Sequence, residues 1–311
     1  MITGKKILFT GATGQVARPV AEQLTAAGNE VWCLARFTDA ATKVALEGAG
    51  IVTVPWDMSQ SDLSGVPTDF THVMHAAVIM EFKDSETAVA RTCEATGQLM
   101  THCRKAESFL FVSSSVVYQY QTPGHLYAET DVIGGLSTPT WMPAYGATKI
   151  AAEGTVRAFA HTLGLPSTIA RLSVGYGFAP GVGPMLGGLV MRYVRNMQAG
   201  DPVPTRPAGE SACSLLHTDD IVRQAPFLFE AASVPATVVN WGGDEATDER
   251  RIVQRLSDLT GLPAAFAEVE TSPRMVGLDP TFRKSITGAC EVGWEDGLRR
   301  AVEVYYPDLV K

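Results

Sequence analysis

The chain has 311 residues, of which 46% are hydrophobic, and its formal net charge at pH 7 is −8. This length allows a large buried core, either in one big domain or in two coupled ones. The acidic balance repels phosphate backbones, so we expect no nucleic-acid partner. No apolar stretch approaches the ~18–20 residues of a membrane span, and no signal peptide precedes the first strand pattern. We therefore expect a soluble, cytoplasmic protein.

The cysteines argue against a disulfide framework. There are five of them, widely spaced and with no Cys-x-x-Cys pair. This spacing predicts reduced thiols and no structural zinc site. We expect no bound metal.

Strand and helix patterns alternate along the first half of the chain. Residues 5–28 contain an apolar strand, a tight glycine turn and a helix that ends at Gly28. Further strand patterns cover residues 30–36, 51–57, 71–77, 108–114 and 167–174, with helix patterns between most of them. The alternation predicts βαβ units and a doubly wound parallel sheet, the Rossmann type of α/β fold.

The composition of the sequence changes after about residue 174, where glycine and proline become frequent and indicate irregular loops. We expect a Rossmann domain that binds NAD(P) over residues 1–173, joined by about 213–243. A smaller, loop-rich substrate lobe is expected over residues 174–212 and 244–311.

A glycine-rich turn follows the first strand pattern, in the segment TGATGQVA at residues 10–17. Gly11 permits a tight turn, Gly14 lets a phosphate approach the backbone, and Ala17 leaves room for the helix to pack on the sheet. A pyrophosphate at that helix N-terminus would meet free N–H groups and the positive end of the dipole. The turn predicts a dinucleotide site that includes Gly11, Thr13, Gly14, Gln15 and Val16.

The end of the second strand discriminates between the two nicotinamide dinucleotides. An acidic residue there binds the ribose 2′-hydroxyl of NAD, whereas an arginine accommodates the 2′-phosphate of NADP. This chain has Ala35 and then Arg36, with no carboxylate at that strand end. We expect NADP(H) to be favoured, with NAD(H) possible. Asp57, at the end of the third strand, could accept from the adenine amino group or cap a turn.

The segment YGATK puts Tyr145 and Lys149 one helical turn apart, with small residues between them. An unperturbed phenol has a pKa near ~10, too high for a base at neutral pH. A cation one turn away, together with the positive charge of an oxidised nicotinamide, is expected to lower that pKa. The alternative is a polar pair on a solvated helix surface.

With these motifs in place, the chain resembles the short-chain dehydrogenase/reductase superfamily, in its extended or atypical branch of the NAD-dependent epimerase/dehydratase type. The resemblance covers nearly the whole chain. The motifs that carry it are TGATGQVA (10–17), WDM (56–58), HAA (75–77), FVSSSVVY (111–118), YGATK (145–149), HTDDIV (217–222) and NWGG (240–243).

The resemblance implies a role for each catalytic residue. Tyr145 would be the general acid/base, Lys149 would hold the nicotinamide ribose, and Ser114 would hydrogen-bond the substrate oxygen. Ser113 and Ser115 stay open as alternatives to Ser114. The cofactor-binding residues expected besides the glycine turn, Tyr145 and Lys149 are Arg36, Asp57, Met58, Ala76 and Ala77. His75 and His217 would support loops and a helix start and take no part in catalysis.

Positions at which the chain departs from the family pattern limit the reactions that it is expected to catalyse. Sugar-nucleotide 4,6-dehydratases carry Thr-Asp-Glu where this chain has Ser114, Ser115 and Val116. Dehydration needs an acid and a base at those places. The resemblance therefore argues against a dehydratase.

Nucleotide-sugar epimerases resemble the chain but carry an Asn where it has Val174 and an Arg where it has Cys213. A diphosphate needs such donors. Arg192, Arg195 or Arg206 could substitute for them, or could be solvated surface residues. The missing donors favour a substrate other than a nucleotide sugar.

Mostly apolar residues occupy the loops that the resemblance places around the substrate, although each could equally belong to the core. The expected substrate-binding residues are Val78, Met80, Ser115, Val116, Val174, Tyr176 and Met185. We expect an NADPH-dependent reductase, or reverse dehydrogenase, acting on a ketone or aldehyde of a small, moderately hydrophobic substrate. The alternative is a redox-neutral epimerase of a sugar or nucleotide sugar with tightly bound NAD(P). A minor alternative is an NADP-sensing regulator.

A homodimer is possible through two long helices, since the family often uses this pair as an interface. One covers about residues 85–106 and the other carries YGATK. The apolar residues of the first, among them Ala88, Leu99 and Met100, are equally explained by packing on the sheet.

Overall fold

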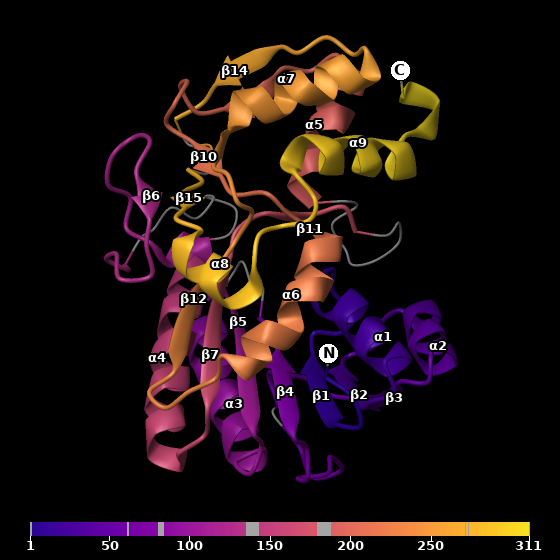
Figure 1. Cartoon of the computed structure of the whole chain (residues 1–311), viewed down its shortest axis with the longest axis vertical. Coiled ribbons are helices and arrows are strands. Elements are labelled where there is room, and N and C mark those ends of the chain that lie inside the picture. The colour runs from indigo at the N-terminus through magenta and orange to yellow at the C-terminus, as the bar shows by residue number, and fades with distance from the viewer. Residues whose placement is uncertain are drawn as a thin grey trace. The chain divides into compact units, whose positions relative to one another are not determined.

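The computed structural model describes residues 2–60, 62–79, 84–134, 143–178, 188–270, 272 and 274–310. The chain divides into two compact units. Unit 1 consists of Met1–Ser114, Met142–Arg171 and Val222–Val239, and unit 2 consists of Ser115–Trp141, Leu172–Ile221 and Asn240–Lys311. Figure 1 labels the helices and strands along the chain.

A seven-stranded sheet is centred on unit 1, in the order β12–β7–β5–β4–β1–β2–β3. Its strands are β1 (Lys6–Thr10), β2 (Glu30–Ala35), β3 (Val52–Pro55), β4 (His72–His75), β5 (Ser108–Ser114), β7 (Ser167–Leu172) and β12 (Thr237–Trp241). The pairs β1–β2, β1–β4, β2–β3 and β4–β5 are parallel. Every residue of β4 and β5 is buried, as expected where helices cover both faces of a parallel sheet. The prediction of a doubly wound Rossmann fold is confirmed.

Helices connect these strands. They are α1 (Ala17–Ala26), α2 (Ala40–Gly48), α3 (Ser85–His102), α4 (Pro143–Leu163) and α6 (Thr218–Glu230). Asp39 caps α2 by accepting from two backbone N–H groups, and Asp84 caps α3 by accepting from Thr87 N. Gly28 has a φ of +86° just beyond α1, as predicted for a helix-ending glycine.

Helices α3 and α4 lie side by side in unit 1 (Figure 1). The two helices approach closely at Gly97, where a Cβ atom would lie only 2.8 Å from Cζ of Phe159. Leu99 and Met100 are fully buried in the core of this unit. Packing on the sheet therefore accounts for these two apolar residues without a partner chain.

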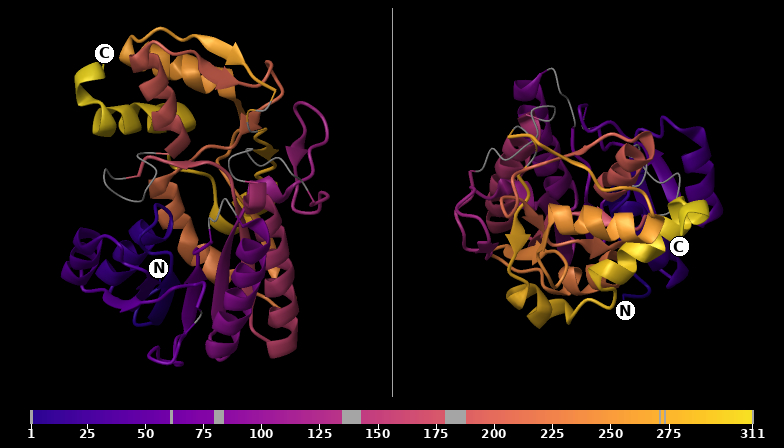
Figure 2. Two further views of the ribbon diagram at one scale, coloured as in Figure 1. Left: turned by 180° about the vertical axis from the view of Figure 1, so that it is seen from behind. Right: turned by 90° about the horizontal axis from the view of Figure 1, so that it is seen from above.

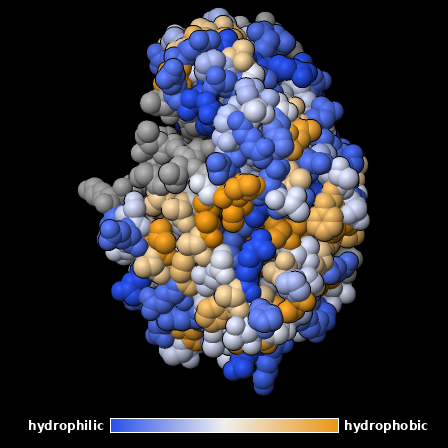
Figure 3. Space-filling view, turned by 90° about the vertical axis from the view of Figure 1, so that its left-hand side faces the viewer, coloured by the Kyte–Doolittle hydropathy of each residue, from blue (hydrophilic) through white to orange (hydrophobic). Residues whose placement is uncertain are grey.

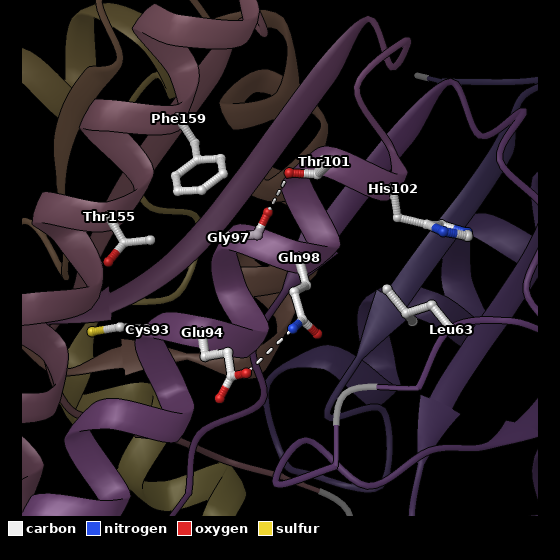
Figure 4. Close-up of a pocket in the computed structure, with 9 residues that line it drawn as sticks. All are labelled: Leu63, Cys93, Glu94, Gly97, Gln98, Thr101, His102, Thr155 and Phe159. Carbon is white, nitrogen blue, oxygen red and sulfur yellow. Dashed lines mark hydrogen bonds between the residues drawn. The ribbon is translucent and has the colours of Figure 1, made fainter.

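A groove of about 670 Å³ runs beside these helices. Figure 4 shows its lining side chains, with Phe159 projecting from α4 near Gly97 of α3. The lining residues are Leu63, Cys93, Glu94, Gly97, Gln98, Thr101, His102, Thr155 and Phe159.

Unit 2 contains four two-stranded sheets and a helical core. Its strands are β6 (Leu126–Tyr127), β8 (Gly175–Tyr176), β9 (Val203–Thr205), β10 (Ala212–Cys213), β11 (Leu216–His217), β13 (Thr247–Asp248), β14 (Phe266–Glu268) and β15 (Gly277–Leu278). Its helices are η1 (Ser115–Val117), α5 (Gly188–Ala199), α7 (Glu249–Thr260), α8 (Thr281–Thr287), α9 (Trp294–Tyr305) and η2 (Pro307–Leu309). The apolar faces of α5, α7 and α9 form its core. Figure 2 shows the orange α7 beside the yellow α9.

On the face drawn in Figure 3, apolar and hydrophilic residues of the described ranges are interspersed. Within the described ranges, none of the helices combines the length and the apolar character that crossing a membrane requires.

Candidate functional site

The site begins where β1 and β4 end, side by side at the carboxyl edge of the sheet. From β1 the chain crosses to β2 on one side, whereas β4 lies on the other, and ligands of such folds bind at this switch point. Gly11 has a φ of +72°, and a Cβ on it would lie 2.8 Å from Ala77 N. Ala76 N and Ala77 N donate to the carbonyl and the hydroxyl of Thr10 at 3.3 and 3.2 Å. These contacts require glycine at position 11.

The N-terminus of α1 is open to a ligand. Val16 provides no side-chain cap, and the first turn of α1 has no acidic residue. In contrast, carboxylates cap the nearby helices α2 and α3. The partly exposed residues Thr13, Gly14, Gln15 and Val16 precede this helix. A helix N-terminus with no side-chain cap and no acidic residue in its first turn fits a dinucleotide pyrophosphate.

Arg36 and Asp57 follow the neighbouring strands β2 and β3. Arg36 is exposed, and Asp57 accepts hydrogen bonds from the hydroxyl and backbone N–H of Ser59 at 2.8 and 2.9 Å. These bonds, followed by the Arg36 charge, lower the pKa of Asp57. Asp57 therefore caps a turn, one of the two roles considered. The sequence argument for NADP missed that a carboxylate from the next strand lies near Arg36.

Two further predicted residues differ in exposure. Met58 has its side chain in the apolar core of unit 1, where it is 6% exposed. Contact between Met58 and a cofactor stays a prediction. Val78 follows the β4 end and is partly exposed.

Ser114, Tyr145 and Lys149 come together in unit 1. Ser114 ends β5, and its hydroxyl is hydrogen-bonded to the phenol of Tyr145 on α4. Lys149 is 2% exposed; its Nζ donates to Val112 O at 2.7 Å and lies 5.8 Å from the centroid of the Tyr145 ring. A buried ammonium contradicts the alternative of a solvated surface pair.

The other two serines face elsewhere. Ser113 donates to Glu153 Oε1 at 2.6 Å, because neighbouring residues of a strand point to opposite faces. Ser115 begins η1 in unit 2. Ser114 is the serine that the structure joins to Tyr145.

Burial dominates the protonation of this set. It raises the pKa of the Tyr145 phenol, and the hydrogen bond from Ser114 opposes the rise. Burial lowers the pKa of Lys149 to about 8, and the charge of Glu153 opposes the fall. The expected lowering of the Tyr145 pKa is therefore not produced by the protein's own groups, because burial removes the water that would solvate a tyrosinate.

The two histidines have structural partners. His75 is buried between Thr10 and Thr96, with ring nitrogens 2.6 and 3.0 Å from their hydroxyls, and burial lowers its pKa to about 3. His217 Nδ1 accepts from Asp219 N at 3.2 Å at the start of α6. Across the described residues, no group of three or more His, Cys, Asp or Glu side chains could hold a metal.

The predicted substrate-binding residues of unit 2 also differ in how exposed their side chains are. Ser115, Val116 and Val174 are partly exposed. Tyr176 is 1% exposed in the core of unit 2, and its hydroxyl donates to Trp294 O at 3.4 Å. Within its own unit the ring packs against α9, and its place in the substrate pocket stays a prediction. Met80 and Met185 lie outside the described residues.

Sequence analysis missed two polar residues of unit 2. Arg274 donates to Glu210 Oε2 at 2.7 Å and lies 4.0 Å from the centroid of the Tyr120 ring. Its Nε has no hydrogen-bond partner in the described part of the chain. Glu249 is 5% exposed and accepts from the Tyr193 hydroxyl. No local spacing signals either residue, because their neighbours come from distant segments.

The arginines considered as substitutes for the missing donors have different environments. Arg206 Nε donates to Ser272 O at 2.8 Å, Arg192 is partly exposed and Arg195 is exposed. Cys213, at the expected arginine position, is fully buried, and burial followed by the charge of Glu249 raises the pKa of its thiol.

A Rossmann sheet with a glycine turn and a Ser–Tyr–Lys set at its carboxyl edge defines the class of dinucleotide-dependent short-chain dehydrogenases/reductases. Residues 7–242 match the NAD dependent epimerase/dehydratase family, and the chain belongs to this family, of the extended type. The chain is an enzyme of this family, as its relatives are.

Two curated relatives illustrate the family. The chain is 23% identical over 316 residues to a UDP-N-acetyl-alpha-D-glucosaminuronate decarboxylase of Bacillus cytotoxicus, covering 96% of this chain and 97% of the relative. It is 26% identical over 331 residues to a trifunctional UDP-glucose 4,6-dehydratase/UDP-4-keto-6-deoxy-D-glucose 3,5-epimerase/UDP-4-keto-L-rhamnose-reductase of Arabidopsis thaliana. That match covers 97% of this chain and 47% of the plant protein.

Among solved structures, the chain is similar to UDP-glucuronic acid 4-epimerase from Bacillus cereus in complex with UDP-glucuronic acid and NAD. The TM-score is 0.80 at 22% identity, with 98% of this chain and 99% of the epimerase covered. MoeE5 in complex with UDP-glucose and NAD gives a TM-score of 0.79 at 24% identity, with 98% and 99% covered. At these identities the likeness establishes the fold.

Proposed function

We propose that this enzyme is a redox-neutral epimerase of a nucleotide sugar that uses a tightly held NAD. The observation that carries the proposal is the Ser114–Tyr145–Lys149 set at the carboxyl edge of the sheet. The relatives supply the reaction class, since their names describe UDP-sugar epimerases, a decarboxylase and a trifunctional enzyme. The cofactor is the one bound in two similar structures.

In this proposal, NAD supplies the acceptor and donor of a hydride. Tyr145 takes the proton of a sugar hydroxyl as its carbon is oxidised, while Ser114 donates to the same oxygen. Lys149, with Nζ 5.8 Å from the centroid of the Tyr145 ring, would add its positive charge to that of the oxidised nicotinamide and so favour the tyrosinate against the effect of burial. Turning the ketone intermediate over and returning hydride and proton to its other face inverts the carbon and leaves no net redox change.

The carboxylate of Asp57 favours NAD over the NADP expected from Arg36 alone. A 2′-phosphate bound near Arg36 would also approach this negative charge, whose pKa is held low. NAD has no such phosphate. The sequence alone predicts NADP(H). Identifying the dinucleotide that the purified protein releases on acid denaturation discriminates between NAD and NADP.

A dehydratase is disfavoured although one relative carries that name. This chain has Ser115 and Val116 where the family's dehydratases have their acidic pair. Neither side chain can supply the acid and base that loss of water needs.

A second candidate is the NADPH-dependent reductase of a small ketone or aldehyde. It is supported by the fully buried Cys213, which offers no positive charge to a diphosphate, and by the carboxyl of Glu249 near it. Arg274 supports the epimerase instead, because its cation, with Nε unpaired among described residues, lies in unit 2 and suits a diphosphate.

The test is cofactor release from freshly purified protein by acid denaturation and chromatography, followed by incubation with UDP-glucose, UDP-glucuronic acid and UDP-N-acetylglucosamine. An epimerase should release about one NAD per chain and interconvert a UDP-sugar with its 4-epimer without consuming NAD(P)H. Empty protein that consumes NADPH with a ketone or aldehyde would support the reductase and refute the epimerase.

A homodimer through α3 and α4 is part of this proposal. The groove beside Gly97 and Phe159 leaves room on that face. Light scattering coupled to size-exclusion chromatography should give twice the mass of one chain, 33.2 kDa. A single-chain mass at micromolar concentration would reject the dimer.

A further inference from the structure

Glu153 lies at the centre of a buried polar network in unit 1. It follows Lys149 by one turn of α4 and is 1% exposed. Arg171 of β7 donates to it twice, from Nε to Oε1 at 3.0 Å and from Nη2 to Oε2 at 2.8 Å. Ser113 of β5 donates to Oε1 at 2.6 Å. Three donors from two strands therefore fix one carboxylate beneath the catalytic turn of α4.

The environment of Lys149 otherwise disfavours a charge. Its Nζ donates to Val112 O at 2.7 Å and lies 5.1 Å from the centroid of the Phe111 ring. A carbonyl and aromatic faces give weaker solvation than water, so burial favours the neutral amine. Burial lowers the pKa of Lys149 to about 8, and Glu153 is the charged group that opposes this fall.

We propose that Glu153 is a positioning residue that acts through Lys149. Its carboxylate, fixed by Arg171 and Ser113, supplies the negative charge that keeps Lys149 an ammonium above Val112. This inference rests on the proposed function for its consequence, since that function gives the ammonium, together with an oxidised nicotinamide, the task of favouring a tyrosinate at Tyr145.

The other titratable and charged groups around this network do not replace Glu153. His75 of β4 faces Lys149 but is neutral, because burial lowers its pKa to about 3. Arg157 of α4 has Nη2 3.9 Å from Glu153 Oε2, and Arg171 is its bidentate partner. Both arginines are cations. Without Glu153, buried Lys149 would therefore share this region with positive charge alone.

A purely structural role is the competing explanation, because the ion pair also ties β7 to α4. The two roles differ in what they do to the titration of Lys149. This can be followed by NMR in protein labelled with [6-¹³C]lysine, with Lys149→Met identifying the resonance. The titration needs no substrate, so its result is independent of whether the proposed reaction is correct.

Replacing Glu153 alone would break the buried ion pair with Arg171, which costs about 3–5 kcal/mol. The main variant is therefore the isosteric pair Glu153→Gln with Arg171→Gln, which removes both charges and keeps side-chain amides. Its Lys149 midpoint should fall by about one pH unit from the wild-type value, because the nearby negative charge is gone. Glu153→Asp keeps the charge and should retain a midpoint close to that of the wild type.

Ser113→Ala is the matched control. It removes one hydrogen bond from the same carboxylate without changing any charge, and should leave the Lys149 midpoint within about 0.3 pH units of the wild type. Circular dichroism melting checks that each variant is folded at 25 °C. An unchanged midpoint in the folded double variant, or an equal fall in Ser113→Ala, overturns the proposal and leaves Glu153 a structural residue.

Discussion

Two buried carboxylates, Glu153 of unit 1 and Glu249 of unit 2, differ in their hydrogen-bond partners. In unit 1, Glu153 accepts from Arg171 and Ser113. In unit 2, Glu249 accepts from Tyr193, yet its Oε2 has no hydrogen-bond partner among the described residues. A fully paired network fixes one geometry, whereas an unpaired buried oxygen costs stability. The comparison shows that the Glu153 carboxylate is held in one geometry by its partners, whereas Glu249 keeps one oxygen without a partner among the described residues.

The largest effect is expected from removing the Tyr145 hydroxyl, which tests whether this residue of unit 1 is the general acid/base. Tyr145→Phe removes the proton donor and acceptor but keeps the ring that faces Lys149. Turnover of the substrate found in the panel should fall by about 10²–10⁴-fold, the usual contribution of a general acid/base. Affinity for NAD, measured by calorimetry, should change by less than about threefold.

Ser113→Ala serves as the comparison for this variant, since it alters a neighbouring hydroxyl that does not bond Tyr145. It should keep most of the turnover. Comparable activity of Tyr145→Phe and Ser113→Ala would show that the phenol is not the acid/base.

A smaller effect, on the pH dependence of stability, is expected from Glu249, the buried carboxyl of unit 2. Burial raises the pKa of Glu249 above its ordinary value of 4.5, although the Tyr193 hydrogen bond opposes the rise. The folded state therefore holds this proton more tightly than the unfolded state. The resulting stability is present below about pH 4.5 and is lost as the pH rises through the raised pKa.

Glu249→Gln keeps the acceptor for Tyr193 and cannot ionise. Its melting temperature relative to wild type should rise by about 2–4 °C between pH 5 and pH 8, since about 1 kcal/mol moves the midpoint that far in a chain of this size class. Glu295→Gln, at an exposed position of α9, is the control and should show no such trend. A flat difference for Glu249→Gln would mean that the carboxyl is satisfied in both states.

The smallest effect concerns packing in unit 1. An Ala at position 97 would place Cβ 2.8 Å from Cζ of Phe159, and overpacking of this kind costs about 1–3 kcal/mol. The higher helix propensity of Ala offsets up to about 1 kcal/mol of this loss of stability. Gly97→Ala should therefore lower the melting temperature slightly.

Gly154 of α4 is the matched position, because a Cβ there would meet nothing within 4 Å. Gly154→Ala should raise stability by about 0.5–1 kcal/mol through propensity alone. Equal effects of the two substitutions would show that Phe159 moves into the neighbouring groove at no cost.

Local patterns predicted the parts of the site that depend on neighbouring residues. The turn around Gly11 is specified by a strand before it and a helix after it, and the Tyr145–Lys149 pair by helical spacing. The sheet followed from alternating strand and helix patterns, which the observed strand order confirms. In each case the partners are close in sequence.

Contacts between distant segments could not be predicted in this way. Asp57 lies near Arg36 because β3 pairs with β2, and Arg171 reaches Glu153 across 18 residues of sequence. The burial of Tyr176 could not be predicted, because an aromatic residue after a strand gives the same sequence pattern in a pocket and in a core. Only the three-dimensional packing distinguishes these cases.

Helix α4 carries Tyr145, Lys149, Glu153 and Arg157 at every fourth position, so that one line of side chains runs from the phenol to the buried ion pair. An α-helix turns about 100° per residue. One residue inserted between 149 and 153 would therefore rotate the carboxylate away from Lys149 without altering either side chain. The chain should accept changes of length in its loops far more readily than in the nine residues from Tyr145 to Glu153. The helical spacing of this span sets the distance between the phenol and the carboxylate.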